Sequence, residues 1–177
     1  MNIRNTLIVA ASAVALSALA GGASAATLTA SAVSSVTVVS PVTLTKTQDM
    51  AFGTVVRPSA SSTSNTTFTM SAAGAVTATG GDGTVVSSPT TAAKFSLVNT
   101  TPGVTFTPSA VLSFAPAGLI NVSAGAPLIT GATGTSAPFG LAVGGTATLA
   151  YGGQFDVTPA TAAQTYTGTL ALTVNYN

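Results

Sequence analysis

The stretch Tyr166–Tyr176, which reads Tyr-Thr-Gly-Thr-Leu-Ala-Leu-Thr-Val-Asn-Tyr, alternates between two kinds of side chain. Its even positions include Leu170, Leu172 and Val174, whereas its odd positions are mostly threonine. Successive side chains of a β-strand point to opposite faces, so one face of this segment is apolar and the other is hydroxylated. The pattern predicts a strand with one side on a hydrophobic core and the other side in water.

The same period-two alternation recurs at residues 94–97 and 146–151, and no stretch after residue 25 has a helical period. Turn signals rich in Gly and Pro separate the alternating runs, and this combination predicts an all-β antiparallel sandwich or barrel. The Asp-Gly pair within residues 80–83 predicts a hairpin joining residues 75–79 to 84–86. Residues 115–138, rich in Gly, Pro and Ala, are predicted to form a long connection.

The composition excludes several classes of function. Of the 177 residues, 46% are hydrophobic and 4% are charged, while 32 Thr and 19 Ser supply many small hydroxyls. Cys, His and Trp are absent, which excludes disulfides, cysteine nucleophiles, His-centred catalysis and metal sites built on His or Cys. The chain has no cluster of Lys and Arg, so we expect no nucleic-acid partner. The aromatic residues are scattered singly, as is typical of core filling.

The first 25 residues have the pattern of a secretory signal peptide. Arg4 precedes a 14-residue apolar run over residues 7–20, and small residues with an Ala-x-Ala pattern follow at 21–25. We therefore expect cleavage after residue 25, export to the periplasm and then to the cell surface or the extracellular medium, and a single domain over residues 26–177. That domain has three cations and three aspartates, so its net charge is zero. Little repulsion opposes its self-association.

The start of the predicted domain differs from the rest of the chain. Leu28, Ala30 and Ala32 alternate with polar residues, and Pro41 then removes a backbone donor. Residues 27–39 and 42–47 are therefore predicted to be two separate pieces. A detached alternating segment over residues 26–40 is suited to pairing with another molecule.

No pattern of catalytic chemistry stands out. Asp49, Asp82 and Asp156 are isolated in the sequence, and the motifs of serine hydrolases and phosphate-binding loops are absent. Asp82 is expected to bond backbone within its own turn, and Asp49 to form a weak surface ion pair with Lys46. We expect no enzyme activity, no cofactor, no metal and no small-molecule substrate.

Three segments resemble a known family. Residues 42–55, which contain Asp49-Met50-Ala51-Phe52-Gly53, resemble the opening of an exported bacterial family known as domain of unknown function 4402. Residues 166–176 resemble its end, and residues 149–153 resemble its glycine-marked penultimate hairpin. That family is similar in outline to the spore coat protein U and archaic fimbrial subunits, which usually carry a cysteine pair that this chain lacks.

The resemblance implies an immunoglobulin-like sandwich of Greek-key type that polymerises by donor-strand exchange. It implies a pilin-like fibre or coat subunit whose partners are further copies or related subunits, a periplasmic chaperone and an outer-membrane assembly pore. No catalytic residue follows from it.

The leading hypothesis is therefore a secreted structural subunit that assembles by β-strand addition. Leu28, Ala30 and Ala32 are expected in the donating segment, and Leu170, Leu172 and Val174 are expected to line the acceptor sheet. The alternative is a monomeric cell-adhesion or carbohydrate-binding module whose loops near residues 115–138 hold the ligand. A small outer-membrane barrel also fits the alternation, but the aromatic content of 6% and the lack of aromatic girdles disfavour it.

Overall fold

The computed structural model describes residues 31–36, 38, 42–86 and 89–177. The chain divides into two units, Met1–Val36 and Thr37–Asn177. In the first unit, residues 31–36 have no regular secondary structure and are exposed, Ala32 among them. The predicted signal peptide, Leu28 and Ala30 lie outside the described residues. The fold reported below is that of the second unit.

The second unit is built from strands, and its described residues include no helix. In chain order the strands are β1 Thr43–Gln48, β2 Val55–Val56, β3 Thr66–Met70, β4 Val76–Gly80, β5 Thr84–Val85, β6 Ala93–Val98, β7 Thr105–Ala115, β8 Ile120–Ala124, β9 Leu128–Thr130, β10 Phe139–Gly140, β11 Thr146–Tyr151, β12 Gly153–Val157 and β13 Thr167–Tyr176. None of the described residues belongs to a helix with the length and apolarity of a membrane span.

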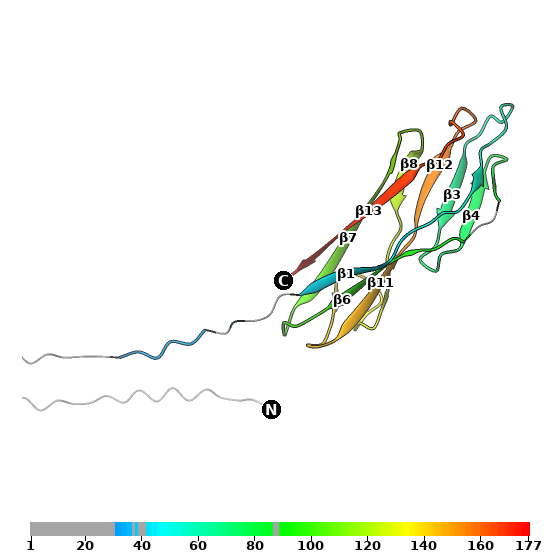
Figure 1. The fold of residues 1–177 in the computed structure, drawn as a ribbon. Coiled ribbons are helices and arrows are strands. Elements are labelled where there is room, and N and C mark those ends of the chain that lie inside the picture. Colours follow the sequence, from blue (N-terminus) through cyan, green and yellow to red (C-terminus); the bar gives the residue numbers. More distant parts are fainter. Residues whose placement is uncertain (1–30, 37, 39–41, 87–88) are drawn as a thin grey trace, which may run out of the picture. The chain divides into compact units, whose positions relative to one another are not determined.

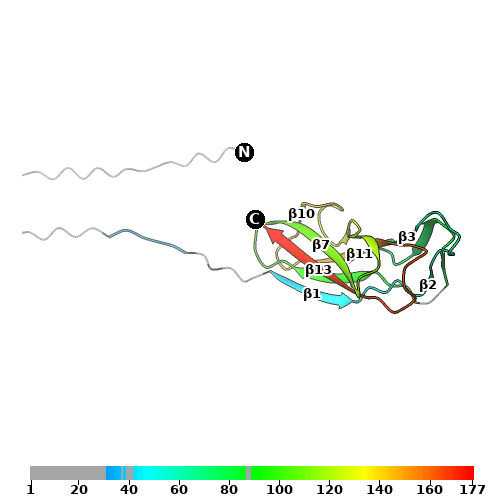
Figure 2. The same cartoon turned by 90° about the horizontal axis from the view of Figure 1, so that it is seen from above.

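Two antiparallel sheets pack face to face in one half of this unit (Figures 1 and 2). One has the strand order β1-β6-β11-β9 and the other the order β10-β7-β13. Buried side chains from both sheets, including Leu97, Leu149 and Phe106, form a common core. The alternation seen in the sequences of β6 and β11 places Leu97 and Leu149 on the inner face, as in other β-sandwiches.

A third sheet, with the order β4-β3-β12-β8, has its own core. Phe68, Met70 and Phe155 from this sheet pack on Leu112 of β7. The long strand β7 therefore serves both cores, since Phe106 near its start lies in the first and Leu112 near its end lies in the second. A short fourth sheet pairs β2 with β5.

The glycines at 152 and 153 do not form the hairpin expected of residues 149–153. Strand β11 pairs with β6 and β9, whereas β12 pairs with β3 and β8, so the chain passes from one sheet to another at Gly152. A Cβ at position 152 would lie 1.9 Å from the carbonyl oxygen of Met70. Glycine is required there because two backbones approach closely, and the expectation of a hairpin was wrong.

The predicted hairpin between residues 75–79 and 84–86 is also wrong. Strand β4 pairs with β3, and β5 pairs with β2. The intervening glycines bond a third segment, because Gly81 N–H donates to the Asn65 carbonyl at 2.9 Å and Gly83 N–H donates to Thr66 Oγ1 at 2.9 Å. These long-range bonds direct the chain from the sheet of β4 to the sheet of β5. The local Asp-Gly signal contains no information about such bonds.

Residues 115–138 are not one long connection, since they contain β8 and β9. Both are short strands at the edges of their sheets. Because most of their residues are exposed or half-buried, they lack the clear alternation of apolar and polar residues that marks the other strands.

The predicted strand at the end of the chain is confirmed as β13, with Leu170, Leu172 and Val174 on its inner face. The all-β, sandwich-like antiparallel architecture is confirmed, and the Greek-key connectivity stays a prediction.

Candidate functional site

Two strand edges are open beside each other in the first half of the fold. Among the described residues, β1 pairs with β6 alone and β13 pairs with β7 alone. Figures 1 and 2 both show β1 starting near the chain end at which β13 finishes, with the two strands running in opposite directions. The open side of the sandwich therefore has an unpaired backbone edge on each flank, which is a template for another strand.

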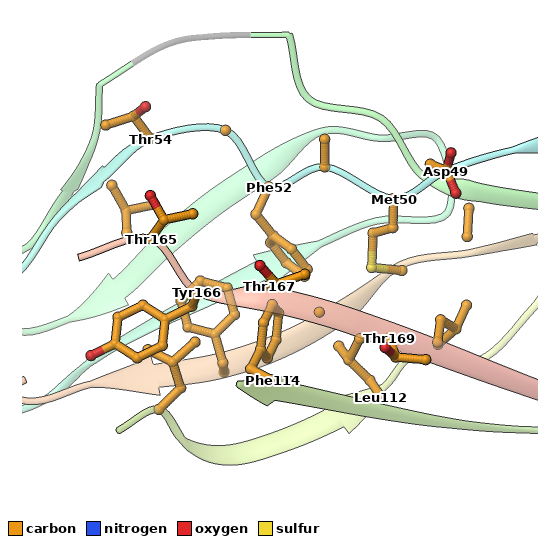
Figure 3. A pocket seen from close by; sticks show the side chains of 18 of the residues that line it. Asp49, Met50, Phe52, Thr54, Leu112, Phe114, Thr165, Tyr166, Thr167 and Thr169 are labelled. Atoms are coloured by element: carbon orange, nitrogen blue, oxygen red, sulfur yellow. The ribbon is translucent and has the colours of Figure 1, made fainter. Parts of the chain in front are cut away.

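A groove of about 1040 Å³ lies between these flanks. One wall is the end of β1 and the segment that follows it, residues 46–57, and the other is the loop before β13 with the first residues of that strand, 161–170. Figure 3 shows Met50 and Phe52 projecting from the first wall toward β13. Thr165, Tyr166, Thr167 and Thr169 contribute hydroxyl groups to the second wall.

The floor of the groove is aromatic and apolar. The rings of Phe52 and Phe155 meet edge to face with centroids 4.9 Å apart, and the Phe114 centroid lies 5.4 Å from that of Phe155 and 6.0 Å from that of Phe52. Gly168 lies directly opposite Phe114 in the β7–β13 ladder, and a Cβ at that position would lie 2.7 Å from the Phe114 ring. The missing side chain at position 168 thus lets the ring lie over β13.

Hydrogen bonds fix the first wall. Ala51 exchanges two backbone bonds with Thr91, at 2.8 and 2.9 Å, and Thr91 Oγ1 donates to the Asp49 carbonyl at 3.0 Å. Because both backbone groups of Ala51 bond Thr91, the backbone groups of Met50 and Phe52 point away from Thr91. The first wall is therefore a strand-like edge. The backbone N–H and C=O groups of Met50 and Phe52 lie on the side of this edge opposite Thr91.

The second wall is anchored by its loop. Arg57 donates through Nη1 to the Thr161 carbonyl at 2.8 Å and so joins the two walls at one end of the groove. Tyr166 donates its hydroxyl hydrogen to the Ala162 carbonyl at 3.1 Å. The loop that precedes β13 is therefore held in place by contacts within itself and to the opposite wall.

The structure separates the three acceptor residues predicted from the sequence. Leu170 lines the groove and contacts both cores, while Leu172 and Val174 are partly buried against the first core, further along β13. The groove residues Phe52, Phe114 and Phe155 were predicted only as core. The Asp-x-x-Phe-Gly motif at residues 49–53 was the available signal, because it lies in the middle of the first wall.

Charged side chains are few, and half of those after residue 25 line this groove: Lys46, Asp49 and Arg57. Lys46 and Asp49 form the predicted ion pair, and their side chains are 59% and 82% exposed. The pair lies at the rim, in contact with solvent, where such a pair contributes about 0–1 kcal/mol. The groove interior is lined by uncharged groups.

The other two aspartates have structural partners. The Asp82 carboxylate accepts a bond from the Ser59 backbone N–H at 2.9 Å, and hydrogen bonds from Ser59 lower the pKa of Asp82. The main partner of the Asp82 carboxylate is thus Ser59, in another segment, and the expected bond to its own backbone contributes less to the lowered pKa. Asp156, 9% exposed, accepts from Thr67 Oγ1 at 2.6 Å and Asn121 Nδ2 at 2.5 Å. The described residues include no group of three His, Cys, Asp or Glu placed to hold a metal.

The chain belongs to the family described as Domain of unknown function (DUF4402), whose model matches residues 42–176. The resemblance noted from residues 42–55, 149–153 and 166–176 is thereby confirmed. No curated protein and no solved structure matches the chain. The further similarity to spore coat protein U and archaic fimbrial subunits stays a prediction.

Proposed function

We propose that this protein is an exported, non-enzymatic structural subunit of a cell-surface fibre or coat, and that copies assemble by β-strand addition. The observation that carries the proposal is the groove between residues 46–57 and 161–170, with an open strand edge on each flank. A strand inserted there would gain backbone hydrogen bonds and seat alternate side chains on an apolar floor.

The chemistry of the groove matches a segment of this same chain. Residues 26–41 carry no charge, and apolar residues alternate with hydroxyl residues over 26–32 and 35–38. The groove has an apolar floor and hydroxyl-bearing walls, with its charges on the rim. In the described part of that segment, Val33, Val36 and Val38 are 101%, 86% and 88% exposed. Burial of such side chains in another copy would favour association.

The acceptor face also fits the proposal. Leu170, Leu172 and Val174 are only partly buried, although they are large and belong to a strand whose outer face is threonine-rich. A neighbouring strand along β13 would complete their burial. Edge strands with exposed apolar side chains are otherwise aggregation-prone, so a specific partner for this edge also protects the protein.

Deletion of residues 27–34 tests the donor. The shortened protein should be exported and folded, but should stay monomeric in size-exclusion chromatography with light scattering at micromolar concentration, where the full chain forms multimers. Filaments labelled by an antibody against this chain should be seen by negative-stain microscopy of cell-surface material for the full chain alone. Unchanged multimers from the deletion variant would contradict the proposal.

A matched pair of substitutions tests the acceptor. Leu172→Ser removes an inner-face side chain of β13, while Ala171→Ser alters the neighbouring outer-face position. We expect the first variant to lose assembly and the second to keep it, with both giving the β-sheet circular dichroism of the parent. Equal assembly of the two folded variants would argue against the β13 edge. A stable full-length monomer with affinity for a glycan would favour the adhesion module instead.

A further inference from the structure

The connection between β2 and β3 contains the densest group of hydroxyl side chains in the protein. Residues 59–64 read Ser-Ala-Ser-Ser-Thr-Ser, so five of these six residues carry a hydroxyl, and Pro58 precedes them. Segments rich in Ser and Thr that also contain proline are typical of O-glycosylated regions. Figures 1 and 2 both show this connection at the end of the second unit opposite the C-terminus. Residues 58–64 do not line the groove, so a group attached to them would leave the groove open.

The hydroxyl groups of this loop are accessible. Ser59, Ser61, Thr63 and Ser64 are exposed, and Ser62 is half-buried. The Ser59 and Ser61 hydroxyls bond each other at 3.0 Å, and Ser62 Oγ donates to the Ser64 carbonyl at 3.0 Å. Among the described residues, the hydroxyls of Thr63 and Ser64 have no hydrogen-bond partner. Modification of these exposed hydroxyls would therefore disrupt little of the fold.

The backbone of the loop is anchored at its ends and has few bonds between them. The Ser59 N–H donates to the Asp82 carboxylate at 2.9 Å, and the Asn65 carbonyl accepts from the Gly81 N–H at 2.9 Å. Within residues 60–64, the one backbone–backbone hydrogen bond described runs from the Ser62 N–H to the Ser59 carbonyl at 3.0 Å. Segments with few backbone hydrogen bonds open at a low cost in free energy. This loop can thus enter the active site of a modifying enzyme, whereas the strand threonines are held in their ladders.

We propose that the hydroxyls of Ser61, Thr63 and Ser64 accept O-linked sugar from a glycosyl diphosphate after export. The hydroxyl oxygen attacks the anomeric carbon of the sugar, and the bond from that carbon to the diphosphate oxygen breaks. The diphosphate leaves, and the hydroxyl proton passes to a base of the transferase. This inference requires export and is independent of assembly.

The structure favours O-linkage over N-linkage in the folded protein. The chain contains three Asn-x-Ser/Thr sequons, which begin at Asn65, Asn99 and Asn121. Asn99 is 0% exposed and its side-chain amide donates to a backbone carbonyl at 2.6 Å, while the Asn121 amide donates to Asp156 at 2.5 Å. Asn65 is exposed, but the hydroxyl of its sequon, Thr67 Oγ1, donates to Asp156 at 2.6 Å within β3. Each sequon therefore has a required group engaged in the fold.

A glycan would supply hydration that the charged residues of this protein do not. After residue 25 the chain has three cations and three aspartates, and Lys46 and Asp49 neutralise each other. Sugars are bulky, polar and solubilising without adding a hydrophobic surface. Placed on the β2–β3 loop, they would hydrate one end of the domain.

Mass spectrometry of the mature protein, purified from the surface fraction of the cells that export it, tests the proposal. The parent chain is compared with S61A/T63A/S64A and with T43A/T45A/T146A, which removes the same number of exposed hydroxyls from strands. Mild alkali removes O-linked sugars from Ser and Thr and leaves N-linked sugars in place. Electron-transfer fragmentation of the tryptic peptide 47–94 of the parent locates the sugar without any substitution.

We expect the parent and the strand variant to exceed the mass of their sequences by whole sugar residues, and the loop variant to lose this excess. Mild alkali should remove the excess, and the fragments should place it within residues 61–64. An excess that persists in the loop variant, or fragments that place the sugar elsewhere, overturns the site. An excess that resists alkali and is lost in N65Q overturns the O-linkage. A parent with the mass of its unmodified sequence overturns the proposal and leaves assembly by strand addition unaffected.

Discussion

The Gly152→Ala substitution tests the sheet-to-sheet crossing, because position 152 has no room for a side chain. The new Cβ would lie 1.9 Å from the Met70 carbonyl oxygen and 2.7 Å from the carbonyl carbons of Met70 and Ser71. Real Cβ atoms essentially never approach closer than 3.0 Å. The backbone of β3 must therefore move away by about 1 Å, since the obstacle is main chain and not a flexible side chain.

The cost follows from what this shift disrupts. Gly153 and Met70 are cross-strand partners at the end of the β12–β3 ladder, so about two backbone hydrogen bonds at about 1 kcal/mol each are lost or weakened. Met70 and the neighbouring Phe68 are almost fully buried, and repacking them costs about 1–3 kcal/mol. We expect the free energy of unfolding to fall by about 3–5 kcal/mol, at the upper end for single substitutions.

Gly125→Ala is the matched control. The backbone N–H of Gly125 donates to the Gly152 carbonyl at 3.1 Å, so the two glycines are neighbours. A Cβ at position 125 would make ordinary contacts of 3.5 Å or more. We expect this variant to stay within about 1 kcal/mol of the parent. Urea unfolding followed by circular dichroism measures both, and a Gly152→Ala variant as stable as Gly125→Ala would refute the steric argument.

Two further predictions concern buried polar groups. Burial raises the pKa of the Tyr151 hydroxyl to about 12, and in the described part of the chain this hydroxyl has no hydrogen-bond partner. Its proton is held more tightly in the folded state, so we expect the contribution of Tyr151 to stability to be constant below pH 10 and to fall by up to about 3 kcal/mol between pH 10 and 12. Tyr151→Phe should flatten that fall at no cost in stability near neutral pH, and an unchanged pH dependence in chemical unfolding would contradict the assignment. Asp156→Asn should lower the free energy of unfolding by about 1.5–3 kcal/mol, because the carboxylate accepts bonds from Thr67 and Asn121 in a nearly buried site. Asp49→Asn, at an exposed rim pair, should change it by less than about 1 kcal/mol, and equal effects in urea unfolding would show that burial is not the cause.

Local sequence patterns were enough to predict an all-β fold and the two faces of the alternating strands. Alternation at residues 94–97, 146–151 and 166–176 was sufficient, because the period of two in side-chain direction is a local property of extended backbone. The family motifs were likewise local, and they included the segment around Phe52 that forms one wall of the groove.

The sharing of the strands among the sheets depends on long-range contacts that the local patterns do not reveal. The glycines at 80–83 and 152–153 resemble hairpin turns locally, yet each passes the chain from one sheet to another through contacts with Asn65, Thr66 and Met70. The groove has the same origin, since Phe52, Phe114 and Phe155 are distant in sequence and meet only when β7, β12 and the 46–57 segment pack together. Such long-range packing leaves no period in the sequence, which is why these aromatic residues were predicted to fill the core and not to form the floor of a site.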